Sequence, residues 1–366
     1  MTQRERMLRT LRFEPTDRIP LIEWPIRKAT ATAWAQQGLR EGVTIARFFG
    51  LDEYALPYPV EAGMFPLFEP VVLETTPRYK IWIDELGATR KDFIEDETPG
   101  FVTRSWLRFP VENRADFQEM KKRYDPNDPG RFPAPWQPIA SALNHSGVAT
   151  HLAIPSFFWA ARDWMGFENL CTAFYDEPAL IEEMFEFLCD FIIALLSRVI
   201  GDAAPDMVEL KEDMAYKHAP MISPAMVRRF MLPQYRRLVD FLKRSGVKMV
   251  FVDCDGYPGD GLMEAWLEAG IGGLSPVEIA AGNDVHQLMR DFPRCVFWGG
   301  IDKRVLIRGR QETYDEIIGK VPAMFERGGW IPHIDHAIPA DAKFTNYIYM
   351  REIIECLVSG RAVPNP

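Results

Sequence analysis

The stretch "MVFVDCDGYPGDG", residues 249–261, joins a short apolar run to a pair of acidic residues. The run reads as a buried strand, and Asp253 and Asp255 follow at a spacing of two, so their side chains point to the same side while Cys254 faces the opposite way. Two carboxylates held together repel each other unless a cation or a shared proton lies between them. A turn needs only one Asp before a Gly, so the second carboxylate suggests a functional role.

Short apolar runs and helical patterns alternate on both sides of this stretch. The predicted strands are residues 148–155, 206–213, 247–256, 271–278, 295–302 and 329–336. The predicted helices are residues 177–200, 223–246, 262–270, 284–292, 313–328 and 344–360. An alternation of strand and helix implies a parallel sheet with helical crossovers.

Most of these strands end in polar or small residues. The ends are Glu212-Asp213, Asp253 to Asp255, Pro276 to Glu278, Gly300 to Asp302 and His333 to His336. In a barrel such ends converge on one mouth, whereas in a doubly wound sheet only two or three could meet. No glycine-rich dinucleotide or phosphate motif follows the early strands. We therefore predict an α/β fold, a (β/α)8 TIM barrel, as one domain over residues 1–366.

The first 135 residues or so form an N-terminal elaboration of this predicted barrel. Thr2 and Glu5 stand at capping-box spacing, which predicts a helix from Thr2 to Leu11. Residues 50–59 and 77–93 look irregular or hairpin-like, and the Pro-, Asp- and Gly-rich residues 123–136 form a loop or linker.

Composition excludes several classes of protein. The net charge of -10 argues against a nucleic-acid surface, which needs a basic stripe. Five scattered cysteines without a CxxC pair favour a reducing compartment. The N-terminus is charged rather than signal-like, and the apolar residues 185–200 are interrupted by Glu186 and Asp190. We predict a cytoplasmic protein that binds neither membrane nor nucleic acid.

The strand-end side chains suggest a metal site, with structural alternatives. Carboxylates such as Asp253, Asp255 and Glu212, together with the imidazole of His336, are ordinary ligands for a divalent cation. The alternative for each acid is a turn or a helix cap. His333 and His336 are three residues apart and cannot both face one side of a strand, so one is functional and the other structural.

Other strand-end residues allow two interpretations each. Glu278 is a pocket carboxylate or a loop residue, and Asp302 and Lys303 belong to a ligand site or to a salt-bridged loop after two glycines. Trp159 lies in "PSFFWAARDWMGF", which suits an aromatic wall or a helix-packing core. Asp335 is placed to orient a histidine.

Three segments carry a resemblance to a known family. "RERMLRTLRFEPTDRIPL", "ISPAMVRRFMLPQYRRLVDFLKRSG" and "GGWIPHIDHAIPADAKFTNY" resemble the uroporphyrinogen decarboxylase superfamily, most strongly over residues 208–354. The resemblance implies a (β/α)8 barrel with its site at the carboxyl mouth. The superfamily includes true decarboxylases and zinc methyltransferases that work with corrinoid proteins, coenzyme M or methyl ethers.

The chain resembles the corrinoid-dependent methyltransferase branch more than the decarboxylases. Of the arginines in the decarboxylases' "MRQAGR" segment, "WPIRKATA" keeps only Arg27. The methyltransferases' His-x-Cys zinc ligands align with Asp253 and Asp255, and their later Cys aligns with His336, ten residues before Asn346. The resemblance thus implies a metal, with zinc as the first candidate, held by two oxygens and one nitrogen.

The resemblance gives three hypotheses for function. The first is transfer of a methyl group between a small O-methyl or related substrate and a corrinoid brought by a partner protein, because the chain lacks a DxHxxG-type cobalamin segment. The second is decarboxylation of a pyrrolic or aromatic carboxylate without metal. The third is non-catalytic binding of a corrinoid or tetrapyrrole. The methyl donor, the direction of transfer and a homodimeric state stay open.

Roles for single residues follow from the first two hypotheses. For catalysis we expect Glu212, Glu278 and Asp302. For substrate binding we expect Arg27, Asp52, Trp159, Lys303 and His333.

Overall fold

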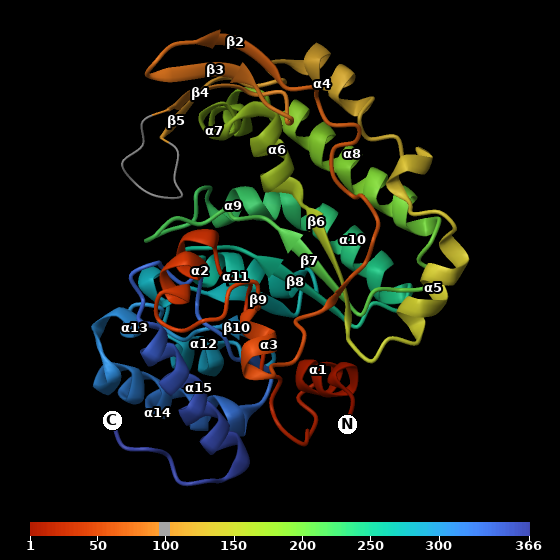
Figure 1. Cartoon of the computed structure of the whole chain (residues 1–366). Helices are drawn as coiled ribbons and strands as arrows, with labels where there is room; N and C mark the ends of the chain where they lie inside the picture. The colour runs from red at the N-terminus through yellow and green to blue at the C-terminus, as the bar shows by residue number, and fades with distance from the viewer. Residues whose placement is uncertain (95–102) are drawn as a thin grey trace.

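A computed structural model of the chain describes residues 1–94 and 103–366. Its centre is a curled sheet of seven parallel strands in the order β1-β6-β7-β8-β9-β10-β11 (Figure 1). The strands are β1 (Leu56–Pro57), β6 (Thr150–Pro155), β7 (Met207–Lys211), β8 (Met249–Asp253), β9 (Gly273–Val277), β10 (Val296–Gly299) and β11 (Trp330–Ile331). The predicted parallel α/β architecture is confirmed.

Helices connect these strands along the outer face of the sheet. They include α6 (Phe157–Met165), α7 (Phe167–Asp176), α8 (Pro178–Ser197), α10 (Leu232–Arg244), α11 (Gly259–Glu268), α12 (Val285–Asp291), α13 (Val305–Arg308), α14 (Arg310–Arg327) and α15 (Phe344–Ser359). The predicted helix from Ser223 begins as α9 (Pro224–Met226), passes through a π-helical turn over Val227–Met231, and continues as α10. Ser223 caps it by accepting a hydrogen bond from the Met226 N–H.

An apolar cluster fills the amino end of the curled sheet. Met207, Phe251 and Trp298 point inward from β7, β8 and β10, and the last two rings stack 4.4 Å apart. Met7 and Leu11 of α1 (Gln3–Leu11) join this cluster and close that end. The capping box predicted for α1 is present. Because this end is packed with side chains, a ligand must enter at the opposite, carboxyl end.

An extended segment, residues 19–24, lies between the two edge strands β11 and β1. The N–H of Asp52, just before β1, donates to the Leu21 carbonyl at 2.8 Å. On the other side the N–H of Ile334, just after β11, lies 3.5 Å from the Glu23 carboxylate. The described residues form a ladder of seven strands, so the curled sheet is confirmed and the predicted closed eight-stranded barrel is not.

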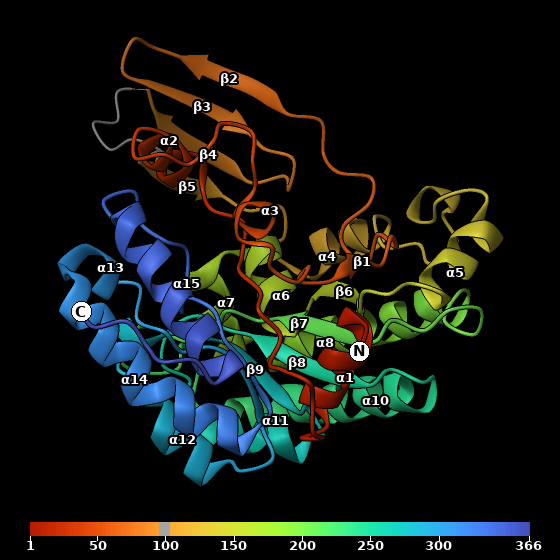
Figure 2. The same cartoon turned by 60° about the horizontal axis from the view of Figure 1, so that its bottom comes forward.

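A second, antiparallel sheet stands apart from the curled one. It contains β2 (Val71–Thr75), β3 (Tyr79–Ile83), β4 (Thr89–Phe93) and β5 (Arg104–Arg108) in sequence order. Figure 2 shows it projecting beyond the body of the molecule. The predicted hairpin over residues 77–93 corresponds to β3 and β4, whereas β2 and β5 were not predicted.

The remaining helices belong to the N-terminal elaboration and its connection to β6. They are α2 (Lys28–Ala35), α3 (Ile45–Phe49), α4 (Arg114–Lys121) and α5 (Trp136–Asn144), with a short 3-10 turn at Pro129–Arg131. Another 3-10 turn, Ile279–Ala281, follows β9. In the part of the chain that the structure describes, no helix combines the length and the apolar character needed to cross a membrane.

Candidate functional site

The carboxyl ends of β8 and β11 bring two predicted residues together. Nε2 of His336 lies 3.0 Å from Oδ2 of Asp255. This hydrogen bond raises the pKa of His336 against the opposing effect of burial, so it favours the imidazolium. The side chains are 25% and 41% exposed, so the pair is accessible to a ligand. It forms the centre of the candidate site.

Asp253 faces the carboxyl group of Glu209, and Lys211 is its register partner on β7. Burial, with the charges of Glu209 and Asp255, raises the pKa of Asp253 to about 8, and a hydrogen bond joins it to Glu209. Glu209 in turn lies 2.8 Å from Nε2 of His151 on β6. At neutral pH the two carboxyls therefore share a proton. This is one of the two arrangements that relieve repulsion between neighbouring carboxylates.

The described residues do not assemble the predicted metal site. In residues 1–94 and 103–366 no group of three His, Cys, Asp or Glu side chains could hold a metal ion. Asp255 and His336 are adjacent, but Asp253 would have to lose its proton and leave Glu209 to join them. The arrangement thus does not fit coordination of zinc by all three predicted ligands.

Glu212 makes contacts of a structural kind, and its role as a catalytic residue or metal ligand stays a prediction. Its carboxylate is fully buried and accepts hydrogen bonds from the N–H groups of Phe157 and Phe158 at 3.2 and 2.8 Å. The hydroxyl of Tyr235 donates to it at 2.5 Å. Glu212 therefore caps the start of α6.

Glu278 and Lys303 form an ion pair across the ends of β9 and β10. The Lys303 Nζ lies 2.7 Å from Glu278 Oε1, and the Gly256 N–H donates to Oε2 at 3.1 Å. The bond to Gly256 ties this pair to the loop that carries Asp255. Both side chains are largely buried, so the pair shapes the wall of the mouth.

Asp302 is engaged within its own loop. Its carboxylate accepts from the Arg304 guanidinium at 2.8 Å, and its N–H donates to Glu316. The salt-bridged loop, one of the two readings, is what the structure contains. A catalytic role for Asp302 has no support in these contacts.

The two histidines of the last strand end differ in their exposure. His333 is fully buried, its ring centre lies 4.9 Å from that of Trp24, and burial lowers its pKa to about 4. A buried neutral ring supports the wall, and the role of His333 in substrate binding stays a prediction. Asp335 is also buried and accepts from the N–H groups of Ile279 and Lys303, so it joins the two neighbouring loops.

Asp52 lies far from this mouth in the fold. Its carboxylate accepts from Arg6 of α1 at 3.1 Å and from Arg18 at 2.6 Å, beside the helix that closes the amino end. Its place does not suit the predicted role in substrate binding. Arg27 immediately precedes α2 and follows Trp24 by three residues, and its predicted role stays a prediction.

Residues that sequence reasoning missed also lie at the mouth. Asp213 has φ of +38°, a left-handed conformation that is uncommon outside glycine. Arg162 of α6 donates to its backbone carbonyl at 2.8 Å and lies 3.3 Å from its carboxylate. The Arg162 guanidinium also lies 4.8 Å from the ring centre of Trp159. The polar strand end was visible in the sequence, but the partner and the backbone conformation were not.

A cavity of about 850 Å³ adjoins the mouth. Lys211, whose backbone pairs with Asp253, lines its inner part together with Trp159 and Asp163 of α6. The rest of its wall comes from residues 61–70 and from the turn between β3 and β4. Trp159 therefore borders a cavity large enough for a small organic ligand.

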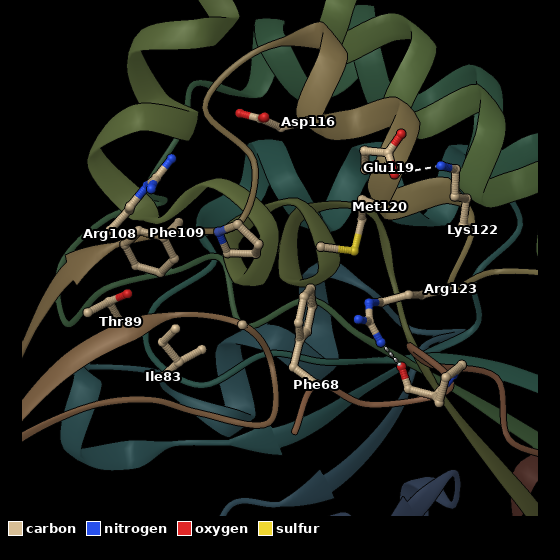
Figure 3. Close-up of a pocket in the computed structure, with 13 residues that line it drawn as sticks. Phe68, Ile83, Thr89, Arg108, Phe109, Asp116, Glu119, Met120, Lys122 and Arg123 are labelled. Carbon is tan, nitrogen blue, oxygen red and sulfur yellow. Dashed lines mark hydrogen bonds and ion pairs between the residues drawn. The ribbon is translucent and has the colours of Figure 1, made fainter. Parts of the chain in front are cut away.

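A second cavity of about 640 Å³ lies between the antiparallel sheet and α4 (Figure 3). Phe68, Ile83 and Met120 point into it, and Phe68 lines both cavities. No residue of the curled sheet lines this second cavity. Of the two cavities, the one beside the mouth is therefore the one that adjoins the candidate site.

A family model and a solved structure with a TM-score above 0.5 agree with this architecture. A family model described as uroporphyrinogen decarboxylase (URO-D) matches residues 106–356. A solved structure described as a methyltransferase from Methanosarcina mazei is 13% identical, with a TM-score of 0.58 over 96% of this chain and 98% of the other. A B12-independent methionine synthase from Shewanella sp. W3-18-1 is also 13% identical, with a TM-score of 0.41 over 63% and 69%. No curated protein matches the sequence.

Proposed function

This chain belongs to the uroporphyrinogen decarboxylase (URO-D) family, and from that premise we propose that it is a methyltransferase. It moves a methyl group between a small O-methyl or related substrate and a corrinoid carried by a partner protein. Its fold is shared with a chain described as a methyltransferase, at an identity that supports the fold alone. The choice of reaction rests on the chemistry of the mouth.

The pairing of basic groups at the mouth carries this proposal. Lys303 pairs with Glu278, Arg162 with Asp213, and His336 with Asp255. A substrate with many carboxylates needs arginines or lysines that can form bidentate or direct ion pairs with it. These cations already face carboxylates of the protein, so the mouth suits a neutral or cationic substrate better than a polycarboxylate.

The Asp255–His336 pair supplies the proton that the reaction needs. When a methyl group leaves an O-methyl substrate, the oxygen keeps the bonding electrons and requires a proton. Asp255 favours the imidazolium of His336 and occupies Nε2, which leaves Nδ1 to donate that proton. A corrinoid supplies the nucleophile that takes the methyl group when its carrier protein binds.

Three finer predictions join the proposal without entering this mechanism. Zinc is the metal implied by the resemblance, but only Asp255 and His336 are adjacent, so no step above depends on it. We further propose that residues 19–24 complete the curled sheet as an eighth, barrel-closing segment. A cytoplasmic location belongs to the same set of proposals.

The test is methyl transfer from a panel of methyl ethers to reduced cobalamin, followed by the absorbance of methylcobalamin. We expect His336→Ala to lower the rate about 100-fold or more, as for loss of a general acid. Glu264→Gln on the exposed surface of α11 is the matched control and should keep the wild-type rate. Equal rates in both variants would contradict the proposal.

Two other experimental outcomes would favour a different function over methyl transfer. Release of carbon dioxide from a pyrrolic or aromatic carboxylate would favour decarboxylation. Tight binding of a corrinoid without turnover under reducing conditions would favour a binding module.

A further inference from the structure

The four strands of the antiparallel sheet are poorly covered. The structure describes each of them in full, and none of their residues is buried. Every residue of the edge strands β2 and β5 is exposed, with Val72 at 57% and Trp106 at 51%. A small sheet needs a packed apolar face to be stable in water, and apolar side chains gathered in the open mark interaction surfaces. We therefore expect a partner that covers this sheet.

The two faces of the sheet differ in what lies next to them. Side chains directly opposite each other on neighbouring strands share a face. Ile83 and Thr89 form such a pair, and both line the cavity beside α4 (Figure 3). The outer face is the opposite one, and its residues form two rows across the strands: Val72, Trp82, Arg90 and Trp106 in one row, and Thr75, Lys80, Asp92 and Arg104 in the other.

Cations and aromatic rings lie side by side on the outer face. Nζ of Lys80 lies 3.8 Å from the ring centre of Trp82, and the Arg90 guanidinium lies 4.1 Å from the same centre. The Arg104 guanidinium lies 5.9 Å from the ring centre of Trp106. Groups of these two kinds attract each other across an interface as well as within one chain.

The charges of the outer face are mostly balanced within the chain. Nη1 of Arg90 lies 3.0 Å from Oδ2 of Asp84, and Nε of Arg104 lies 3.7 Å from Oδ1 of Asp92. Lys80 forms no ion pair with any residue that the structure describes. Two copies of such a nearly neutral face can approach each other without strong repulsion. A partner recruited by charge would instead need a patch of one sign.

The outer face is also complementary to itself. Two sheets stack about 10 Å apart, and a two-fold axis between them relates two copies of one chain. An axis parallel to the strands places β3 over β4 of the second copy, so Lys80 faces Asp92. An axis perpendicular to the strands, midway between the rows, places each strand over itself, so Lys80 faces Trp82. Arg90 faces Trp82 in the first arrangement and Asp92 in the second, so both bring unlike groups together.

We propose that the chain forms a homodimer in which the outer faces of two antiparallel sheets pack against each other. Val72 and Trp106, exposed in the single chain, become buried there and supply the apolar contacts. A carrier protein that visits the mouth leaves after each turnover and uncovers the sheet, whereas a second copy covers it permanently. The dimer does not depend on the proposed reaction.

Sedimentation velocity over about 2 to 200 µM protein measures the dimer dissociation constant. Lys80→Asp places an acid opposite Asp92 or removes the cation facing Trp82, so it should raise this constant about tenfold or more. Trp106→Ser removes a large apolar contact and should act in the same direction. Lys122→Asp makes the same charge change at an exposed lysine that follows α4, and it should leave the constant unchanged.

Cross-linking locates the interface independently of these affinities. Lys80→Cys adds one thiol to the outer face, and a bismaleimide with a reach of about 10 Å should join two copies of this variant. Lys122→Cys should stay single after the same treatment, as should the wild-type chain with its half-buried Cys171.

Three results would overturn the homodimer. The first is a wild-type protein that stays monomeric over the whole concentration range. The second is a dimer that Lys80→Asp leaves intact and that does not cross-link through residue 80. The third is a monomer whose antiparallel sheet becomes protected from hydrogen exchange only when a corrinoid carrier is added, because that result assigns the outer face to the carrier.

Discussion

The two ends of the curled sheet differ in how their carboxyl groups are compensated and how exposed these groups are. At the amino end, the buried Asp52 accepts from Arg6 and Arg18, beneath an apolar interior. At the carboxyl end, Asp253 is held protonated, and the Asp255–His336 pair is partly exposed. The first arrangement stabilises the fold, and the second leaves groups whose proton or charge can change when a ligand binds. This division is typical of barrel-like enzymes, in which one end provides stability and the other chemistry.

The largest expected effect comes from replacing one carboxylate at each end and comparing the loss of unfolding free energy. Asp52→Ala leaves two arginines beside a buried site without their partner, so we expect about 3–5 kcal/mol of lost unfolding free energy. Asp255→Asn removes a half-exposed partner and should cost less than about 1 kcal/mol. Denaturant titration of both variants measures the difference. A larger loss in Asp255→Asn would reverse the assignment of the two ends.

A smaller loss of unfolding free energy is expected for Glu212. Glu212 lies at the carboxyl end of the sheet, yet its contacts are structural. Glu212→Ala removes the acceptor for the first N–H groups of α6 and for Tyr235, so it should cost about 2 kcal/mol. Glu278→Ala, on the mouth wall, is the comparison variant. If Glu212→Ala abolished methyl transfer at unchanged stability, its structural role would be wrong.

The protonated state of Asp253 predicts a pH dependence of stability. Its folded pKa of about 8 is above its unfolded value, so the folded state binds the extra proton between about pH 4 and pH 8. The stabilising contribution is complete below this window and is lost as the pH rises through it. We expect wild type to lose stability relative to Asp253→Asn over that range in thermal or denaturant unfolding. Parallel pH profiles would contradict the shared proton.

The smallest expected change is in the affinity for zinc. Since Asp253 pairs with Glu209 and not with Asp255, zinc should bind Asp253→Asn about as tightly as it binds wild type. Elemental analysis after dialysis, together with competition against a chromophoric chelator, measures this. Stoichiometric zinc that is lost in the variant would support the ligand set of the resemblance and require the mouth to rearrange.

The sequence predicts the main sheet well, because short apolar runs and helical periods alternate without interruption from β6 to α15. It also brings Asp255 and His336 to one mouth, since parallel strands end on the same side. The position of Glu212 among the helices also follows from the period of two residues in a strand. Lys211 and Asp253 pair across two strands and face inward, so the next residue, Glu212, must face the helices.

Other features depend on contacts between distant segments. The partner of Asp253 is Glu209, which becomes visible only when the register of β7 and β8 is known. β2 and β5 are exposed edge strands, so they lack the alternation that predicts a half-buried strand. The left-handed conformation of Asp213 likewise has no sequence signature.

The segment between β11 and β1 has a consequence for how the chain folds. The Glu23 carboxylate accepts from the Tyr347 hydroxyl at 3.1 Å, and Trp34 donates to the Ala342 carbonyl at 2.7 Å. These partners are more than 300 residues apart in sequence. The contacts can therefore form only after nearly the whole chain has been synthesised. Contacts of such long range slow folding and leave apolar surface exposed meanwhile. The newly made protein should therefore depend on chaperones until its last helix emerges from the ribosome.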